Sequence, residues 1–400
     1  MVKKKKAPKA RSSSPWEHDS LPVILQDVAD PPPPLPPPPP PPPEMWSCLE
    51  AAMEPLACGK AYYFDSRGDV TFTVGDPDQG TRDFVVCSRT VARWSSVFSA
   101  MLFGGFAESR PKSDGWRVLL PEDEVAPVFL AFKLIHGSHE NTPKTLERDE
   151  LYQLLVVTEK YDMTRILRPW AATWFEPYKN TSSIEGNEIV MWIAWELGHE
   201  ECFRRLAADL LLKSKVNEDG ELLDKEGVPL NTYTCLEPPG ILESVAQSRG
   251  KLIETMTGFL QDVIQGALSK RRCQGGNHYS GGYSYCNRCG SSSIPNTRLS
   301  EEQCAAFVFG SLTHVFSGAG LQGLVFPQAT EFRYLGSAKK FLTTIEDMHY
   351  QITSGHECCN PLPALQEKAR NLVKAAPSPV TEQHLEYLRS QAKKTGILGN

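Results

Sequence analysis

The first clear pattern in the chain is an alternation of apolar and polar residues. Val70, Phe72 and Val74 are separated by threonines, which is the period of a strand with one buried face. A polar segment with glycines at both ends, 75–80, comes next, and an apolar run follows at 84–86. Two strand-like runs joined by a polar turn predict a β-hairpin.

Apolar residues then recur at steps of three and four, which is the period of a helix with one buried face. These steps predict helices at 91–102, 128–135 and 151–161, and a strand at 116–120 separates the first two helices. A small sheet cannot bury its apolar face alone, so we expect the helices to cover it. The pattern therefore predicts an α+β fold with a small sheet covered by helices.

Beyond residue 177 the pattern is mainly helical. We expect one long helix or two short ones in a helical extension at 185–213, and a polar linker at 214–231. In a helical C-terminal region, 236–400, helices are predicted from a capping box at 300–303 and from apolar repeats at 241–268, 341–350 and 385–388. The repeat at 241–268 falls short of three clean heptads, so a packed helix is expected there rather than a coiled coil.

Residues 1–60 differ in composition from the rest of the chain. Six lysines and arginines with no acid lie within 1–11, and twelve prolines form a block at 31–43. Few of these side chains could form a core, so we predict a disordered tail in which the prolines form an extended rod. The rod would serve as a spacer or as a ligand for an aromatic groove. The basic run would be a nuclear-import signal or a solubilising tail.

The overall composition narrows the class of protein. The 400 residues are 40% apolar, which leaves room for two or three domains, and the net charge of −6 does not favour a nucleic-acid partner. No apolar run follows the basic run to make a secretory signal, and no window is apolar enough to cross a bilayer. The eleven irregularly spaced cysteines fit a reducing compartment. We expect a nuclear or cytoplasmic protein that is not secreted and has no membrane partner.

Six motifs in the first predicted domain resemble those of one known family. They are GDVTFTV at 68–74, FVVC at 84–87, VARWSSVFSAM at 91–101, FAE at 106–108, VLLPED at 118–123 and EKY at 159–161. In their order and spacing they resemble a BTB/POZ domain spanning 66–178. Cys87 and Ser88 stand where the family usually has a histidine and a lysine, which puts any role of that pair in doubt. The segments 192–213 and 236–240 are similar to a fungal group of BTB proteins.

The resemblance implies a binding protein rather than an enzyme. BTB domains form homodimers or hetero-oligomers, and some join cullin-type ubiquitin ligases to their substrates, so the expected partners are proteins, with a cullin among the candidates. The expected interaction residues are Asp69, Trp94, Val97, Phe98 and Met101. The segments around the last four carry more apolar side chains than one small domain is expected to bury. The alternative is that all of these apolar residues lie in the core.

A group of candidate metal ligands lies late in the chain. Cys273, His278, Cys286 and Cys289 fall within seventeen residues of glycine-rich sequence. The last two form a CxxC followed by glycine, a turn that structural zinc sites use. These residues predict a structural zinc ion, and substitute ligands are available if the helices fold back: Cys304, His356, Cys358 and Cys359. The alternative is a flexible loop with free thiols.

These patterns together predict a scaffold or adaptor. The BTB-like domain would oligomerise, the helical region would bind a partner, and the tail would localise or tether the protein. The sequence contains no GxSxG motif, no GxxxxGK[ST] motif and no strand-linked GxGxxG motif, so no catalytic activity is expected. The alternative is a nuclear regulator that uses zinc and the basic tail to act on chromatin or nucleic acid.

Overall fold

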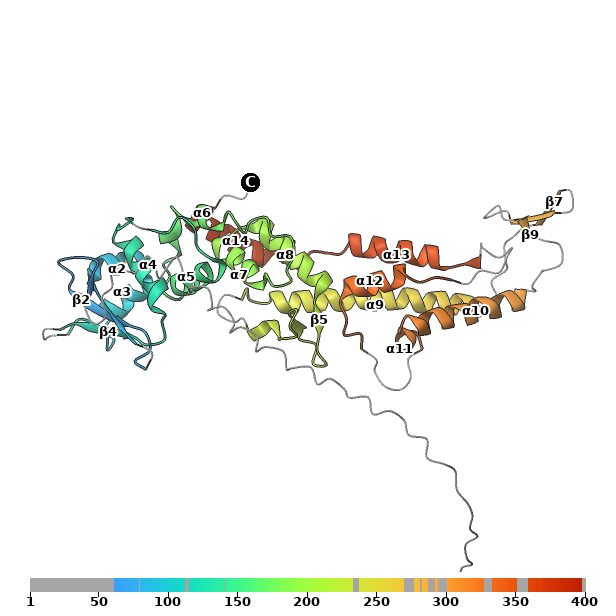
Figure 1. The fold of residues 1–400 in the computed structure, drawn as a ribbon, viewed down its shortest axis with the longest axis horizontal. Helices are drawn as coiled ribbons and strands as arrows, with labels where there is room; N and C mark the ends of the chain where they lie inside the picture. The colour runs from blue at the N-terminus through green and yellow to red at the C-terminus, as the bar shows by residue number, and fades with distance from the viewer. Residues whose placement is uncertain are drawn as a thin grey trace, which may run out of the picture. The chain divides into compact units, whose positions relative to one another are not determined.

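The computed structural model describes most of the chain after the predicted tail. The described residues are 61–78, 80–111, 115–140, 142–232, 237–269, 301–326, 333–350 and 359–397, together with the backbone of strands at 277–280, 283–286 and 292–293. The tail itself, 1–60, lies outside them. The described part is α+β, mostly helical with a small sheet, which confirms the predicted fold class (Figure 1).

Four strands of the described chain form one sheet in the order β1-β3-β2-β4. They are β1 (Tyr62–Tyr63), β2 (Val70–Val74), β3 (Arg82–Val86) and β4 (Arg117–Leu120). β2 and β3 make the predicted hairpin, with Phe72 opposite Phe84, and β4 runs parallel to β2. The alternating residues of β2 are buried on one face, so the period of two in the sequence corresponds to the core side of the sheet.

Helices cover this sheet and close its core. They are α2 (Ser88–Trp94), α3 (Ser96–Phe103), α4 (Val125–Ile135) and α5 (Arg148–Lys160), followed by η1 (Thr164–Leu167) and α6 (Ala171–Phe175). The rings of Phe98 and Phe132 lie 5.2 and 5.1 Å from the ring of Phe72. Such aromatic pairs add about 1 kcal/mol each to the free energy of burial. The sheet and α3 and α4 therefore share one aromatic core.

The helix predicted at 91–102 is two helices, α2 and α3. Between them Ser95 has an extended backbone, with φ −132° and ψ 118°. Its Oγ accepts a hydrogen bond from the backbone N–H of Phe98 at 2.9 Å and donates to the carbonyl oxygen of Tyr161. Ser95 thus caps α3, and a serine cap has no apolar signature that would interrupt the repeat in the sequence.

The extension predicted at 185–213 consists of two helices, α7 (Glu188–Leu197) and α8 (Glu200–Lys213). Between them Gly198 has a φ of +81°, a left-handed conformation that glycine adopts at little cost. α7 is buried on nearly all sides, whereas α8 has one buried face. The sequence left one or two helices open, and the structure has two.

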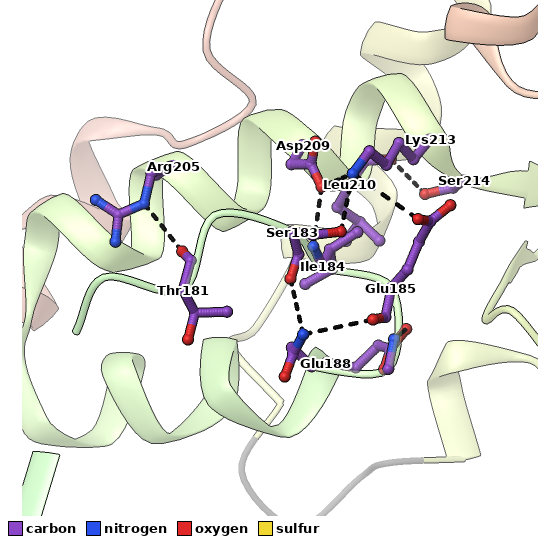
Figure 2. A network of polar contacts seen from close by, with 12 residues as sticks. Thr181, Ser183, Ile184, Glu185, Glu188, Arg205, Asp209, Leu210, Lys213 and Ser214 are labelled. Carbon is purple, nitrogen blue, oxygen red and sulfur yellow. Dashed lines mark hydrogen bonds and ion pairs between the residues drawn. The ribbon is translucent and has the colours of Figure 1, made fainter. Parts of the chain in front are cut away.

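Polar contacts fix the loop between α6 and α7 to α8 (Figure 2). The Nζ of Lys213 donates to the Oγ of Ser183 at 2.8 Å and pairs with the Asp209 carboxylate at 2.9 Å. The Nε of Arg205 donates to the carbonyl oxygen of Thr181 at 3.0 Å. The sheet and its helices are thereby joined to α7 and α8 by an ordered segment.

The prediction of a polar linker at 214–231 is wrong. The segment forms β5 (Lys215–Val216) and β6 (Leu222–Leu223), which pair in an antiparallel ladder, and then η2 (Leu230–Thr232). Val216, Leu222 and Leu230 are buried. These widely spaced apolar residues anchor a segment whose other positions are polar, so its composition resembles that of a linker.

The rest of the described chain is helical apart from short strands. α9 (Ile241–Leu268) packs against α10 (Glu301–Gly318), α11 (Gln322–Val325), α12 (Ala338–Glu346) and α13 (Leu362–Lys374), while α14 (Glu382–Thr395) packs against α7 and η1 (Figure 1). β7 (Asn277–Ser280), β8 (Tyr283–Cys286) and β9 (Ser292–Ser293) form a separate antiparallel sheet. The buried apolar residues make one contiguous cluster from the first sheet to α14.

None of the helices in the described ranges combines the length and the apolar character needed to cross a bilayer.

Candidate interaction surface

Exposed apolar side chains gather on the end of α2, on α3 and on the turn after it. Trp94 is 37% exposed, Val97 36%, Phe103 50% and Phe106 61%, and Ala100 between them is also exposed. We call these five residues the α3 surface. Single exposed apolar side chains are ordinary, whereas several that follow closely along the chain make this segment a candidate interaction site.

The spacing along α3 explains why one set of apolar residues is buried and another is exposed. Val97, Ala100 and Phe103 follow one another at steps of three, so they lie on one side of the helix. Phe98 and Leu102 are four apart on the other side, and both are fully buried. Because both sides are apolar, α3 has more apolar surface than the sheet can cover.

The exposed end of α3 is positioned by a tight turn and by Trp116. A Cβ at Gly104 would lie 2.4 Å from the carbonyl oxygen of Ala100 and 3.1 Å from the ring of Phe106, so only glycine fits. The Phe103 ring meets the Trp116 ring edge to face, with centroids 6.0 Å apart. The indole N–H of Trp116 in turn donates to the carbonyl oxygen of Glu108 at 2.8 Å. The turn after α3 is therefore held in one conformation.

Asp69 directly precedes β2, and its side chain contacts the first residue of α2. Its carboxylate accepts hydrogen bonds from the backbone N–H and the hydroxyl of Ser88, both at 2.8 Å. A carboxylate at this place satisfies an otherwise unpaired amide of the first helical turn. The predicted interaction residue thus positions α2, and through it Trp94.

Cys87, one of the two departures from the pattern of the family that the sequence was predicted to resemble, lies next to His136. Its backbone N–H donates to the Nε2 of His136 at 3.2 Å, so the proton of this neutral ring is on Nδ1, which donates to the carbonyl oxygen of Phe132 at 2.9 Å. Burial lowers the pKa of His136 and favours the neutral ring. The contact connects β3 to the end of α4 through the backbone, which does not depend on the side chain at 87.

The remaining predicted interaction residues divide between the surface and the core. Trp94 and Val97 lie on the α3 surface, and Met101 is partly buried against the core. Phe98 is 0% exposed and stacks on the Tyr161 ring at 4.2 Å, so it supports the core and is not available to a partner. For Phe98, the structure favours the alternative reading, in which it is a core residue.

Sequence reasoning missed Phe103 and Phe106 as surface residues. The sequence does contain a signal for their exposure. Phe103 continues the three-residue step from Val97, and Phe106 lies beyond two glycines that end the helix. A period alone does not tell which of two apolar faces meets the sheet. Leu119 and Tyr63 are also more than 60% exposed, on the two edge strands of the sheet.

A cavity of about 240 Å³ lies elsewhere, where α5, α7 and α14 approach one another. Its wall includes Glu159, Trp195, Glu196, His384 and Tyr387. Trp195 and Tyr387 stack with centroids 4.1 Å apart. None of the residues predicted as interaction or metal sites lines this cavity.

The buried carboxylate of Glu196 in this wall holds α14 to the rest of the protein. It accepts hydrogen bonds from Thr164 at 2.9 Å, from the Gln391 amide at 2.7 Å and from the Tyr387 hydroxyl at 3.0 Å. Burial raises the pKa of Glu196, while these donors oppose the rise. The carboxylate thus joins η1, α7 and α14.

The predicted zinc ligands lie largely outside the described residues. Cys273 and Cys289 are not described, and only the backbone of His278 and Cys286 is, in β7 and β8. Of the substitute ligands, Cys304 and Cys359 are described and lie together, with their sulfurs 3.6 Å apart. No group of three or more potential metal ligands occurs within the described ranges.

No protein-family model and no curated protein matches the chain, so these comparisons assign it to no family.

The α3 surface offers apolar area and aromatic rings for burial by another molecule. On association, each of its large side chains would contribute on the order of 1 kcal/mol, because roughly half of its area remains to be buried.

Proposed function

We propose that this protein is an interaction scaffold that associates with a second copy of itself through the α3 surface. The observation that carries the proposal is the exposed side of α3, with Val97, Ala100 and Phe103, whose opposite side is fully packed. Trp94 at the end of α2 and Phe106 in the turn after α3 are exposed at either end of it. This row agrees with the binding role that the BTB/POZ resemblance implies. The role assigned is binding rather than catalysis.

The charge pattern supports pairing of two identical surfaces. The fourteen residues from 94 to 107 include no Asp, Glu, Lys or Arg. In a two-fold symmetric contact each patch meets its own copy, so any charge near the centre would face a like charge. The segment itself adds no such charge; the Asp162 carboxylate, which accepts a hydrogen bond from the Ser96 hydroxyl at 2.6 Å, is not one of the five residues of the α3 surface. Aromatic side chains at its centre are also the type that contributes most to protein interfaces.

The test compares two valines with similar exposure in the full chain. Val97 is 36% exposed on the α3 surface, and Val228 is 42% exposed in the loop between β6 and η2. We expect Val97→Asp to weaken self-association at least about ten-fold, or about 1.4 kcal/mol, because it places a carboxylate in an apolar contact. Val228→Asp should have no effect.

Light scattering over a range of protein concentrations measures the outcome. The unsubstituted chain should reach twice its mass of 44.5 kDa, and Val97→Asp should remain a monomer under the same conditions. Circular dichroism checks that both variants are folded. A monomer at every concentration without substitution, or equal association of the two variants, contradicts the proposal.

A further inference from the structure

Two cysteines that are 55 residues apart in the sequence meet in the helical region. Cys304 lies in the first turn of α10, and Cys359 lies just before α13. Their sulfur atoms are 3.6 Å apart. α10 and α13 both pack against α9, which brings the first turn of one helix to the start of the other. The pair is therefore a product of the tertiary fold.

The distance between the sulfurs fits two ligands of one metal ion. A disulfide bond would place them about 2.05 Å apart. Two thiolates bound to one zinc ion, each about 2.3 Å from it at a tetrahedral angle, lie roughly 3.8 Å apart. The observed 3.6 Å, at which the Cys304 thiol donates a hydrogen bond to the Cys359 sulfur, is close to the second value and far from the first. The side chains need little movement to bind a shared ion.

The surroundings of the pair are partly closed to solvent. Cys304 is 7% exposed. Cys359 is partly buried. Limited solvent access of this kind is typical of the surroundings of a structural metal site.

We propose that Cys304 and Cys359 bind one zinc ion as thiolates and so join the start of α10 to the start of α13. Binding releases the two thiol protons to solvent, and no electron transfer is involved. Thiolate ligands favour zinc over hard cations such as magnesium or calcium. Zinc takes four ligands in structural sites, so two further donors complete its shell. The proposal concerns the metal and is independent of self-association through the α3 surface.

Metal analysis of the full chain, purified without added zinc, tests the site. We expect at least one equivalent of zinc in the unsubstituted protein. Cys304→Ser and Cys359→Ser should each remove about one equivalent, and the double variant should remove no more than either alone, because both residues hold the same ion. Cys87→Ser is the control, since Cys87 lies in the other half of the fold and makes its contact to His136 through the backbone.

A second measurement uses the unsubstituted protein, so it does not depend on the variants folding. A chelator should make Cys304 and Cys359 reactive toward iodoacetamide, as read by peptide mass spectrometry, and added zinc should protect them again. Zinc content that is the same in the serine variants, reactivity that ignores chelator and zinc, or a Cys304–Cys359 disulfide in the purified protein would overturn the proposal.

Discussion

Replacing Gly198 by alanine is expected to destabilise the attachment of α14 by about 3 kcal/mol, of which about 1 kcal/mol is the cost of a left-handed alanine and the rest is steric. Gly198 has a φ of +81°, and a Cβ there would lie 2.2 Å from the backbone nitrogen of Ala392 and 2.5 Å from the carbonyl oxygen of Leu388. Both atoms belong to the backbone of α14, which cannot yield as a side chain could. The helix would have to move away from α7 and α8.

Gly137→Ala is the matched control for this substitution. Gly137 also has a left-handed backbone, with a φ of +73°, but a Cβ there would meet no atom within 4 Å. The Gly137→Ala variant should therefore lose only the stability that a left-handed alanine costs, without the steric part. Urea unfolding gives the free energy for each variant, and limited proteolysis near 375–381 reports release of α14. Equal stability of the two variants would show that the close contact between Gly198 and α14 does not exist.

Replacing Arg249 by methionine should destabilise the helical region by about 3 kcal/mol, because buried carbonyl groups lose their donors at about 1 kcal/mol or more each. Arg249 lies on α9 and is 4% exposed. Its guanidinium donates to the carbonyl oxygens of Ser214 and Tyr334, each at 3.2 Å, and to that of Gly336. Burial lowers its pKa to about 10, so it is still charged at neutral pH.

The carbonyl groups remain after the substitution, which is why an apolar replacement cannot compensate for the loss. Lys251→Met is the control, since Lys251 is exposed on the same helix. Arg249→Lys should fall between the two, because one ammonium cannot reach all three oxygens in the way that the planar guanidinium does. Thermal and urea unfolding measure the differences. If Arg249→Met is as stable as Lys251→Met, the three hydrogen bonds contribute nothing to folding.

Much of the architecture follows from local patterns in the sequence. The threonine-separated residues Val70, Phe72 and Val74 predict β2, and the apolar steps within 241–268 predict α9 with the same bounds that the structure has. These predictions succeed because a buried face repeats with the period of its element. The division of 91–102 at Ser95 could not be predicted, because it depends on a cap that also donates to Tyr161, which is distant in sequence.

The positions of buried charges and of the cysteine pair could not be read from the sequence. Glu196 and Arg249 are charged residues on helices, and most such residues face solvent. Here each is buried because partners from distant segments satisfy it: Gln391 for Glu196, and Tyr334 for Arg249. A similar dependence on tertiary contacts brings Cys304 to Cys359. The sequence identified both cysteines as substitute metal ligands, but it did not predict that their side chains lie in contact.

The candidate surface, too, could be predicted only in part from the local sequence. The helical period identified Trp94, Val97, Phe98 and Met101 as one apolar set, and the structure separates them by the direction in which each side chain points. Only the placement of the sheet decides that Phe98 is buried and Val97 exposed. For that reason the surface could be assigned to a segment from the sequence, but not to individual residues.

Hydrogen exchange of the full, unsubstituted chain at low and high protein concentration tests self-association through the α3 surface most directly. If two copies pair there, backbone amides in α3 and in the turn through Phe106 should exchange more slowly at high concentration, while those of α8 should exchange at the same rate in both. Exchange in α3 that does not change with concentration, or slowing confined to other elements, would contradict a self-association surface on α3.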